Sequence, residues 1–211
     1  MTQTQKIFQD VYKSEIWGKD KSGFCSGLGS VDPDIVLPYC RAVLFFLNAI
    51  GQKQSVVDFG CGDFKVGSRL RPYFAAYTAC DIVPELIESH KQQYKDLNVD
   101  FRCIDATVEE LPQAEIIIIR QVLQHLSNAD ILKLLPKFKK FKYIIFTDHT
   151  PVHRKFTPNL DITTGGYTRM QAGSGLDLLS HPFYLEPRVE YLLCAVPSES
   201  GIIKTSVYQM H

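Results

Sequence analysis

One stretch of the sequence, SVVDFGCGDF, has residue types and spacing that could bind a small ligand. Gly60 and Gly62 flank a cysteine, and Asp58 and Asp63 stand on either side of them. Glycines between a strand and a helix let a ligand approach the backbone closely. A dinucleotide would need a third glycine and would place its pyrophosphate near Asp63, which repels an anion. The stretch therefore favours a ligand that carries positive charge.

S-adenosylmethionine carries that charge on its sulfonium and ammonium groups, and it presents two ribose hydroxyls. Asp58 can attract the amino-acid end, directly or through water, and the glycines admit the methionine part. Asp81 lies 21 residues after Gly60, near the spacing at which an acid accepts both ribose hydroxyls. Asp105 and Ala106 follow another apolar run and are placed to meet the adenine edge. The predicted cofactor-binding residues are Asp58, Gly60, Cys61, Gly62, Asp63, Asp81, Ile82, Asp105, Ala106, Arg120, Gln121 and Trp17.

These acids come together if the apolar runs before them are neighbouring parallel strands, because open parallel sheets bind ligands at the carboxyl ends of their strands. From residue 55 the sequence alternates β-branched runs with helical segments, which predicts an α/β fold with right-handed crossovers. Two strand-like runs at the end predict a hairpin with one antiparallel strand. The predicted strands cover 55–59, 75–82, 99–105, 115–120, 142–148, 190–196 and 202–210, and the predicted helices cover 64–74, 84–97 and 128–141.

Two more helices are expected before this alternation, one amphipathic over 2–16 and one from Asp32 to Gly51. Pro38 is expected to delay the start of the second helix, and Pro136 to strain or end the helix over 128–141. We predict a single domain over 1–211. It divides into a helical cap (1–51), a cofactor-binding core (52–149), an irregular segment (150–187) and the terminal hairpin (188–211).

Three residues near predicted strand ends could accept a proton during a reaction: His125, Asp148 and His149. Each of them could instead be structural. The irregular segment is rich in proline and glycine, and a connection of this length usually covers or binds something. We expect it to form a substrate lid whose binding residues are Asn159, Asp161, Tyr167 and Arg169. A second lid could include Trp17, Gly18, Ser26 and Gly29, and His153 is a weaker candidate base.

The quoted motifs resemble those of the class I S-adenosylmethionine-dependent methyltransferases. VVDFGCGDF is similar to their first motif, CDIVPELI to their second, RCIDA to their third, and IIIIRQVLQHL to the fourth-strand segment of the small-molecule members. The resemblance covers Ser55 to His211 and implies a Rossmann-like, mostly parallel sheet of seven strands with an antiparallel C-terminal hairpin. CGDF, DIVPELI, RQVLQHLS and NLDITTGGYTR also resemble a group of small bacterial methyltransferases.

The composition restricts the kinds of molecule that the protein is expected to bind. Formal net charge is zero over 211 residues, which argues against tight binding to a nucleic-acid backbone. The six cysteines show neither CxxC nor zinc spacing, so we expect no metal. No apolar segment is expected to reach the length that spans a membrane, and we expect no membrane partner. We therefore expect a cytoplasmic protein that methylates a small molecule or a sugar. The alternatives are a non-catalytic cofactor-binding module and an NAD(P)-dependent oxidoreductase.

Overall fold

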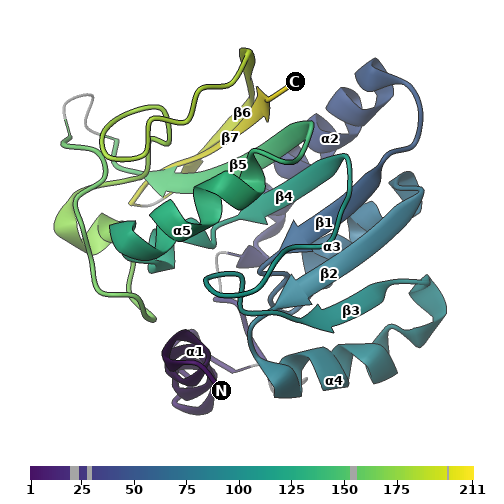
Figure 1. Ribbon diagram of the computed structural model, residues 1–211, viewed down its shortest axis with the longest axis horizontal. Helices are drawn as coiled ribbons and strands as arrows, with labels where there is room; N and C mark the ends of the chain where they lie inside the picture. Colours follow the sequence, from purple (N-terminus) through teal and green to yellow (C-terminus); the bar gives the residue numbers. More distant parts are fainter. Residues whose placement is uncertain (20–23, 28–29, 153–155, 199) are drawn as a thin grey trace.

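The computed structural model describes residues 1–19, 24–27, 30–152, 156–198 and 200–211. Its centre is a seven-stranded sheet with the order β3-β2-β1-β4-β5-β7-β6 (Figure 1). β7 is antiparallel to both of its neighbours, and the other neighbouring pairs are parallel. The predicted α/β fold with an antiparallel terminal hairpin is therefore confirmed. The strands are β1 (Ser55–Phe59), β2 (Ala76–Asp81), β3 (Asp100–Cys103), β4 (Ile116–Arg120), β5 (Tyr143–Thr150), β6 (Val189–Ser198) and β7 (Gly201–Gln209).

Helices cover both faces of the sheet because alternate strand residues bury apolar side chains on opposite sides. On one face, residues of β1 and β4 such as Val56 and Ile118 pack with α2 (Pro33–Ile50) and α3 (Lys65–Leu70). On the other face, Val57 and Ile117 pack with α5 (Asn128–Phe138). α4 (Pro84–Gln93) contributes buried residues to both clusters.

Pro38 and Pro136 do not delay or end their helices as the sequence predicts. α2 begins at Pro33 with Asp32 as its N-cap, so Pro38 does not delay it, and α5 continues through Pro136 to Phe138. Each ring removes one helical hydrogen bond. The apolar face that each helix buries against the sheet compensates for that loss.

α2 also corrects the expectation that no apolar segment has the length to span a membrane. With 18 residues it is long and apolar enough to cross a bilayer by length and composition alone. One face of the helix is nevertheless buried against the sheet, where the Phe46 ring lies 5.3 Å from that of Tyr143 in an edge-on contact. A core helix of a globular domain has this pattern.

The first helix, α1 (Gln3–Lys13), lies apart from both helical layers, near the carboxyl ends of the first three strands (Figure 1). Its N-cap residue Thr2 donates a hydrogen bond to Asp105, and Gln5 Nε2 donates to the Ile82 carbonyl oxygen at 3.2 Å. Gln9 Nε2 lies 3.0 Å from Glu85 Oε2. Polar contacts therefore hold α1 over the strand ends that carry the predicted cofactor site.

The segment between β5 and β6 is irregular, as predicted. Among its described residues the regular element is a single 3₁₀ turn, η5 (Arg169–Ala172). Buried side chains such as Leu178 and Leu185 anchor the segment to the same core as α5.

Candidate functional site

A cavity of about 470 Å³ opens at the carboxyl ends of β1 to β4. The strand order reverses between β1 and β4, and such a switch point is where open parallel sheets bind ligands. Three parts of the chain line the cavity: the strand ends, the N-terminal region with α1, and residues 166–171 of the irregular segment. The predicted cofactor-binding residues that line it are Trp17, Asp58, Gly60, Cys61, Gly62, Asp63, Asp81, Ile82, Asp105, Ala106, Arg120 and Gln121.

The glycine turn forms the floor of the cavity. Gly60 and Gly62 have φ angles of 67° and 52°, in the left-handed region that favours glycine. A Cβ at Gly60 would lie 2.5 Å from a methyl group of Val122, and a Cβ at Gly62 would overlap the Ser26 hydroxyl. Both positions therefore require glycine, because of their positive φ angles and because a Cβ would come too close to neighbouring side chains. Without these side chains, a ligand can approach the backbone closely.

Asp81 and His90 hold the Gly62 peptide groups in place. Asp81 Oδ2 accepts a hydrogen bond from the Gly62 N–H at 3.0 Å, and Oδ1 accepts from the Val83 N–H at 3.2 Å. His90 Nε2 donates to the Gly62 carbonyl oxygen at 2.6 Å. The Asp81 carboxylate offers about four acceptor positions, so two remain for ribose hydroxyls.

His90 was missed in the sequence. The available signal was its position four residues after the buried Leu86 on a short helix, which places both side chains on one face. Burial lowers the pKa of His90, so the neutral ring donates through one nitrogen.

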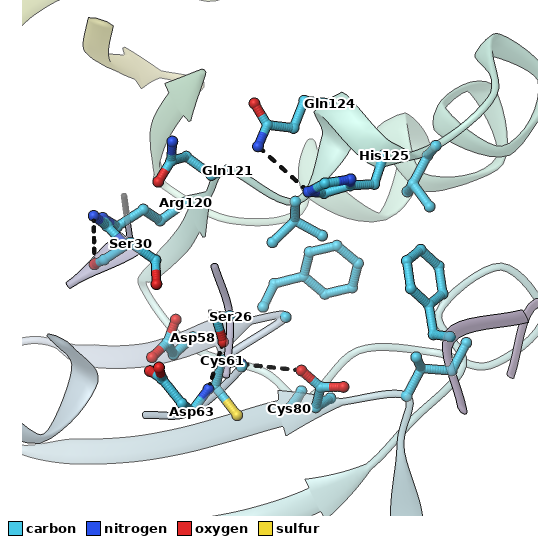
Figure 2. A pocket seen from close by; sticks show the side chains of 18 of the residues that line it. Ser26, Ser30, Asp58, Cys61, Asp63, Cys80, Arg120, Gln121, Gln124 and His125 are labelled. Atoms are coloured by element: carbon cyan, nitrogen blue, oxygen red, sulfur yellow. Dashed lines mark hydrogen bonds between the residues drawn. The ribbon is translucent and has the colours of Figure 1, made fainter. Parts of the chain in front are cut away.

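Opposite charges face each other at the inner end of the cavity. Figure 2 shows Asp58 and Asp63 on one side and Arg120 on the other. Asp58 accepts a hydrogen bond from the Tyr77 hydroxyl at 2.8 Å, and burial raises the pKa of Asp58 to about 6. Asp58 is therefore ionised at neutral pH.

Three polar atoms at this end have no hydrogen-bond partner among the described residues: Asp63 Oδ2, Arg120 Nε and the Tyr39 hydroxyl. Asp63 Oδ2 also lies 3.8 Å from the Lys65 ammonium, which is an ion pair rather than a hydrogen bond. A zwitterion with an ammonium and a carboxylate would supply partners for both signs of charge. The donor set therefore fits the amino-acid end of S-adenosylmethionine.

The opposite end of the cavity fits a nucleoside. Asp105 Oδ1 accepts from the N–H and the hydroxyl of Thr107, at 2.9 Å and 2.6 Å. Asp105 and Ala106 are buried, and Ile82 lines the wall beside them. Lys137 of α5 donates to the Ala106 carbonyl oxygen at 2.6 Å and thereby holds this loop. The arrangement leaves an apolar slot with a polar edge, which suits a purine.

His125 lies at the far side of the cavity, in the 3₁₀ turn η4 (Leu123–His125) that follows β4 (Figure 2). Its Nδ1 lies 3.2 Å from the Tyr167 carbonyl oxygen, which only accepts, so Nδ1 carries the proton. Nε2 then carries the electron pair of the ring, and the Gln124 side-chain N–H donates to it at 3.4 Å. Burial, aided by the Arg169 charge, lowers the pKa of His125 to about 4, so the ring is neutral at pH 7.

Trp17 and Gln121 complete this side. The Trp17 ring centroid lies 4.7 Å from that of His125, and Trp17 Nε1 donates to the Gly166 carbonyl oxygen at 2.9 Å. Gln121 has a φ of 57°, which is unusual for a residue with a side chain. Its N–H donates to the Thr147 carbonyl oxygen at 2.8 Å, and this bond holds the bend directly after β4.

Of the four predicted lid residues, Tyr167 lines the cavity and the others lie outside its lining. The Arg169 side chain is buried and donates to the carbonyl oxygens of Leu123, Leu126 and Leu160 and to Asn128 Oδ1. Asn159 is also buried and bonds to backbone atoms of Asp177 and His181. Asp161 accepts from the Asn128 N–H at the start of α5. These contacts give the three residues a structural role.

Asp148 and His149 also lie outside the lining of this cavity. Asp148 Oδ2 accepts from the Leu176 N–H at 2.9 Å, and His149 Nε2 lies 2.7 Å from the Ser198 hydroxyl. The structure therefore brings His125 alone of the three candidate bases to the cavity. Ser26 lines it too, Gly18 does not, and Gly29 and His153 lie outside the described residues.

Residues 57–141 match the family model described as a methyltransferase domain. Among solved structures, the chain is similar to the N-methyltransferase NodS from Bradyrhizobium japonicum WM9 in complex with S-adenosyl-L-homocysteine. The TM-score is 0.65 at 12% identity, over 95% of this chain and 96% of that chain. It is also similar to the magnesium protoporphyrin IX methyltransferase ChlM from Synechocystis PCC 6803 with bound S-adenosylmethionine. Here the TM-score is 0.60 at 14% identity, over 99% of this chain and 98% of that chain. A search of curated proteins found no match.

Proposed function

We propose that this chain, which contains a methyltransferase domain on the class I S-adenosylmethionine-dependent fold, methylates a small molecule or a sugar. One observation carries the proposal: a single cavity combines the glycine turn, the strand-end acids and the neutral His125. NodS and ChlM have the same fold and were crystallised with S-adenosylhomocysteine and S-adenosylmethionine, respectively. That likeness supports the cofactor assignment.

We propose that the chain binds the cofactor in three places. Asp58, Asp63 and Arg120 hold the amino-acid end through opposite charges. Asp81 accepts the ribose hydroxyls, and the loop at Asp105 and Ala106 borders the adenine. The bound cofactor supplies a methyl group on a sulfonium, a bond that breaks with its electron pair left on sulfur.

The contribution of the protein to the reaction is mainly positioning and exclusion of water. When the accepting atom carries a proton, Nε2 of His125 is the base in this proposal. Tyr167 contacts the substrate at the mouth of the cavity, while Arg169 and Asn159 position the segment that carries Tyr167. Gln121, directly after β4, lies where the methyl group would be transferred.

The size of the cavity favours a small substrate. The volume of about 470 Å³ has to hold the cofactor together with the substrate, and it lies in the range of small-molecule sites, about 300–1,000 Å³. The zero net charge gives no general attraction for nucleic acid. All six cysteines are free, which supports a reducing compartment such as the cytoplasm.

The test is calorimetric titration of the purified protein with S-adenosylmethionine and S-adenosylhomocysteine, with NAD and NADP as comparison ligands. We expect both sulfur ligands to bind. Asp81→Ala should weaken both by at least about tenfold, because it removes a charged acceptor for two hydroxyls. Asp100→Ala is the matched control, since Asp100 lies on the neighbouring β3 with a half-exposed side chain whose partner among the described residues is Arg102. Failure of the sulfur ligands to bind, or tighter binding of a nicotinamide, would overturn the proposal.

A further inference from the structure

Charged residues occupy only one side of the cavity. Among the described residues that line it, the carboxylates are Asp58, Asp63, Asp81 and Asp105, and the permanent cation is Arg120. All five belong to the ends of β1 to β4 or to the turns that follow them. They are the groups assigned above to the polar parts of the cofactor.

On the opposite side, the described lining residues are uncharged, and several of them are aromatic. We call it the roof and define it as the described lining residues of regions 4–17 and 166–171. None of these has a charged side chain. Its centre is Trp17, whose ring centroid lies 5.2 Å from that of Tyr12 and 6.1 Å from that of Phe8. Tyr167 adds a further ring at the mouth, where its side chain is exposed.

The roof meets the sheet side at His125. The Trp17 and His125 rings are in contact, and the Gly165 N–H donates to the His125 carbonyl oxygen at 2.9 Å. With the proton on Nδ1, Nε2 of His125 is an acceptor, and the Gln124 side-chain N–H donates to it. Gln124 is buried beside it, and its Oε1 has no hydrogen-bond partner among the described residues. This part of the cavity therefore places a proton acceptor beside aromatic rings, while the buried Arg169 guanidinium acts on the acceptor from outside the cavity lining.

These observations restrict the substrate. An anionic group placed against the roof would be removed from water with no described cation to pair with it, at considerable cost. An ammonium would lie near the sulfonium of the cofactor, and the two like charges would repel each other. A flat neutral ring instead gains from edge-on and offset contacts with the Trp17 and Tyr12 rings.

We propose that the methyl acceptor is an uncharged aromatic molecule with a hydroxyl group, bound between the roof and His125. The inference rests on the proposed function and narrows its substrate. The hydroxyl oxygen forms a bond to the methyl carbon while the carbon–sulfur bond breaks and its electron pair stays on sulfur. The substrate hydroxyl takes the place of the Gln124 N–H at His125 Nε2 and passes its proton to that nitrogen. The imidazolium releases the proton to water when the product leaves.

The experiment compares four probes that differ in charge or aromaticity. They are p-cresol, 4-hydroxyphenylacetate, tyramine and cyclohexanol, which provide a neutral, an anionic and a cationic phenol and a neutral alcohol without an aromatic ring. Each is titrated by calorimetry into protein saturated with sinefungin, a non-reacting analogue in which an ammonium replaces the methylsulfonium and keeps its positive charge. Trp17 is the only tryptophan of the chain, so its fluorescence reports binding at the roof in the same samples.

We expect p-cresol to bind at least about tenfold more tightly than each of the other three and to change the Trp17 fluorescence. Equal or tighter binding of a charged probe or of cyclohexanol would overturn the inference, as would no binding of p-cresol. In each of these outcomes S-adenosylhomocysteine still binds. Loss of S-adenosylhomocysteine binding itself would instead overturn the proposed function.

Two variants test whether p-cresol binds at the roof. Trp17→Leu and Tyr167→Leu should each weaken p-cresol binding, and in Tyr167→Leu the binding of S-adenosylhomocysteine should stay within about twofold. Tyr167 is mostly exposed, so its variant does not endanger folding. Tyr73→Leu, a half-exposed aromatic residue outside the cavity lining, is the matched control. Unchanged p-cresol affinity in both test variants contradicts binding at the roof.

Discussion

At the scale of single residues, Asp148 is a buried acid whose ionised form has few stabilising contacts among the described residues. Its side chain is 2% exposed, one oxygen accepts from the Leu176 N–H, and the other has no hydrogen-bond partner among the described residues. Burial raises the pKa of Asp148 to about 7. The folded protein therefore binds this proton more tightly than the unfolded chain, whose aspartates titrate near pH 3.9. Stability is lost as pH rises between these two values.

We predict that Asp148→Asn increases the free energy of unfolding at pH 8 relative to the wild type, by up to about 4 kcal/mol. The amide oxygen can keep the Leu176 bond, and no charge is left to bury. The gain should shrink as pH falls towards 4, where the wild-type carboxyl is protonated. Urea denaturation at both pH values measures it, with the half-exposed Asp100→Asn as control. The same difference from wild type at pH 4 and at pH 8 would contradict the assignment.

At the scale of elements, Arg169 joins the irregular segment to η4 and α5. Its guanidinium donates to the Leu123 carbonyl oxygen at 3.0 Å and to the Leu126 carbonyl oxygen at 2.7 Å. It also donates to Asn128 Oδ1 at 2.7 Å. A planar fork with several N–H groups can bridge these oxygens at once, whereas an ammonium is a single point of charge.

We predict that Arg169→Lys destabilises the protein by about 3 kcal/mol, because buried carbonyl oxygens lose their partners. The irregular segment should then become the first site of proteolysis. Limited proteolysis with mass spectrometry and chemical denaturation would measure these two effects. The half-exposed Arg102, paired with Asp100, provides Arg102→Lys as the control. Wild-type stability in Arg169→Lys would show that the segment is held mainly by its apolar anchors.

At the scale of the whole molecule, the cavity depends on three chain regions that are far apart in sequence. α1 and Trp17 come from the start, the glycine turn and acids from the centre, and Tyr167 from the irregular segment. A ligand that contacts all three stabilises the folded state by mass action.

We predict that S-adenosylhomocysteine at 100 times its dissociation constant stabilises the fold by about 2.7 kcal/mol. For a chain of this size that corresponds to a rise in Tm of about 5–11 °C. Thermal unfolding followed over a range of ligand concentrations checks the value, with NAD at the same concentrations as the comparison. A concentration-dependent rise with NAD of equal size would contradict the cofactor assignment.

Much of the fold could be predicted because its signals are local. β-branched runs such as Ile116–Arg120 predict buried strands, and capping at Asp32 and Gly51 marks the ends of α2. Pro38 and Pro136 show where local rules fail, since tertiary packing compensates for a lost hydrogen bond. The order of strands and helices does not depend on such details.

The cavity residues from the sheet could also be anticipated, because they belong to strand ends. Asp58, Gly60, Asp81 and Asp105 stand beside or after apolar runs, and parallel strands bring their carboxyl ends to one edge. Their assignment to the cofactor remains a prediction that calorimetry tests.

The amino-acid sequence by itself determined the α/β class, the order of the elements and the convergence of glycines and acids at one edge of the sheet. Only the tertiary structure decided which other polar residues face the cavity. Arg169 and Asn159 turn inward to satisfy carbonyl oxygens, whereas His125 receives its tautomer from the Tyr167 carbonyl, 42 residues away in the sequence. The reason is physical: periodicity reports which face of an element is buried, but a polar side chain takes its role from partners that only folding brings within hydrogen-bond distance.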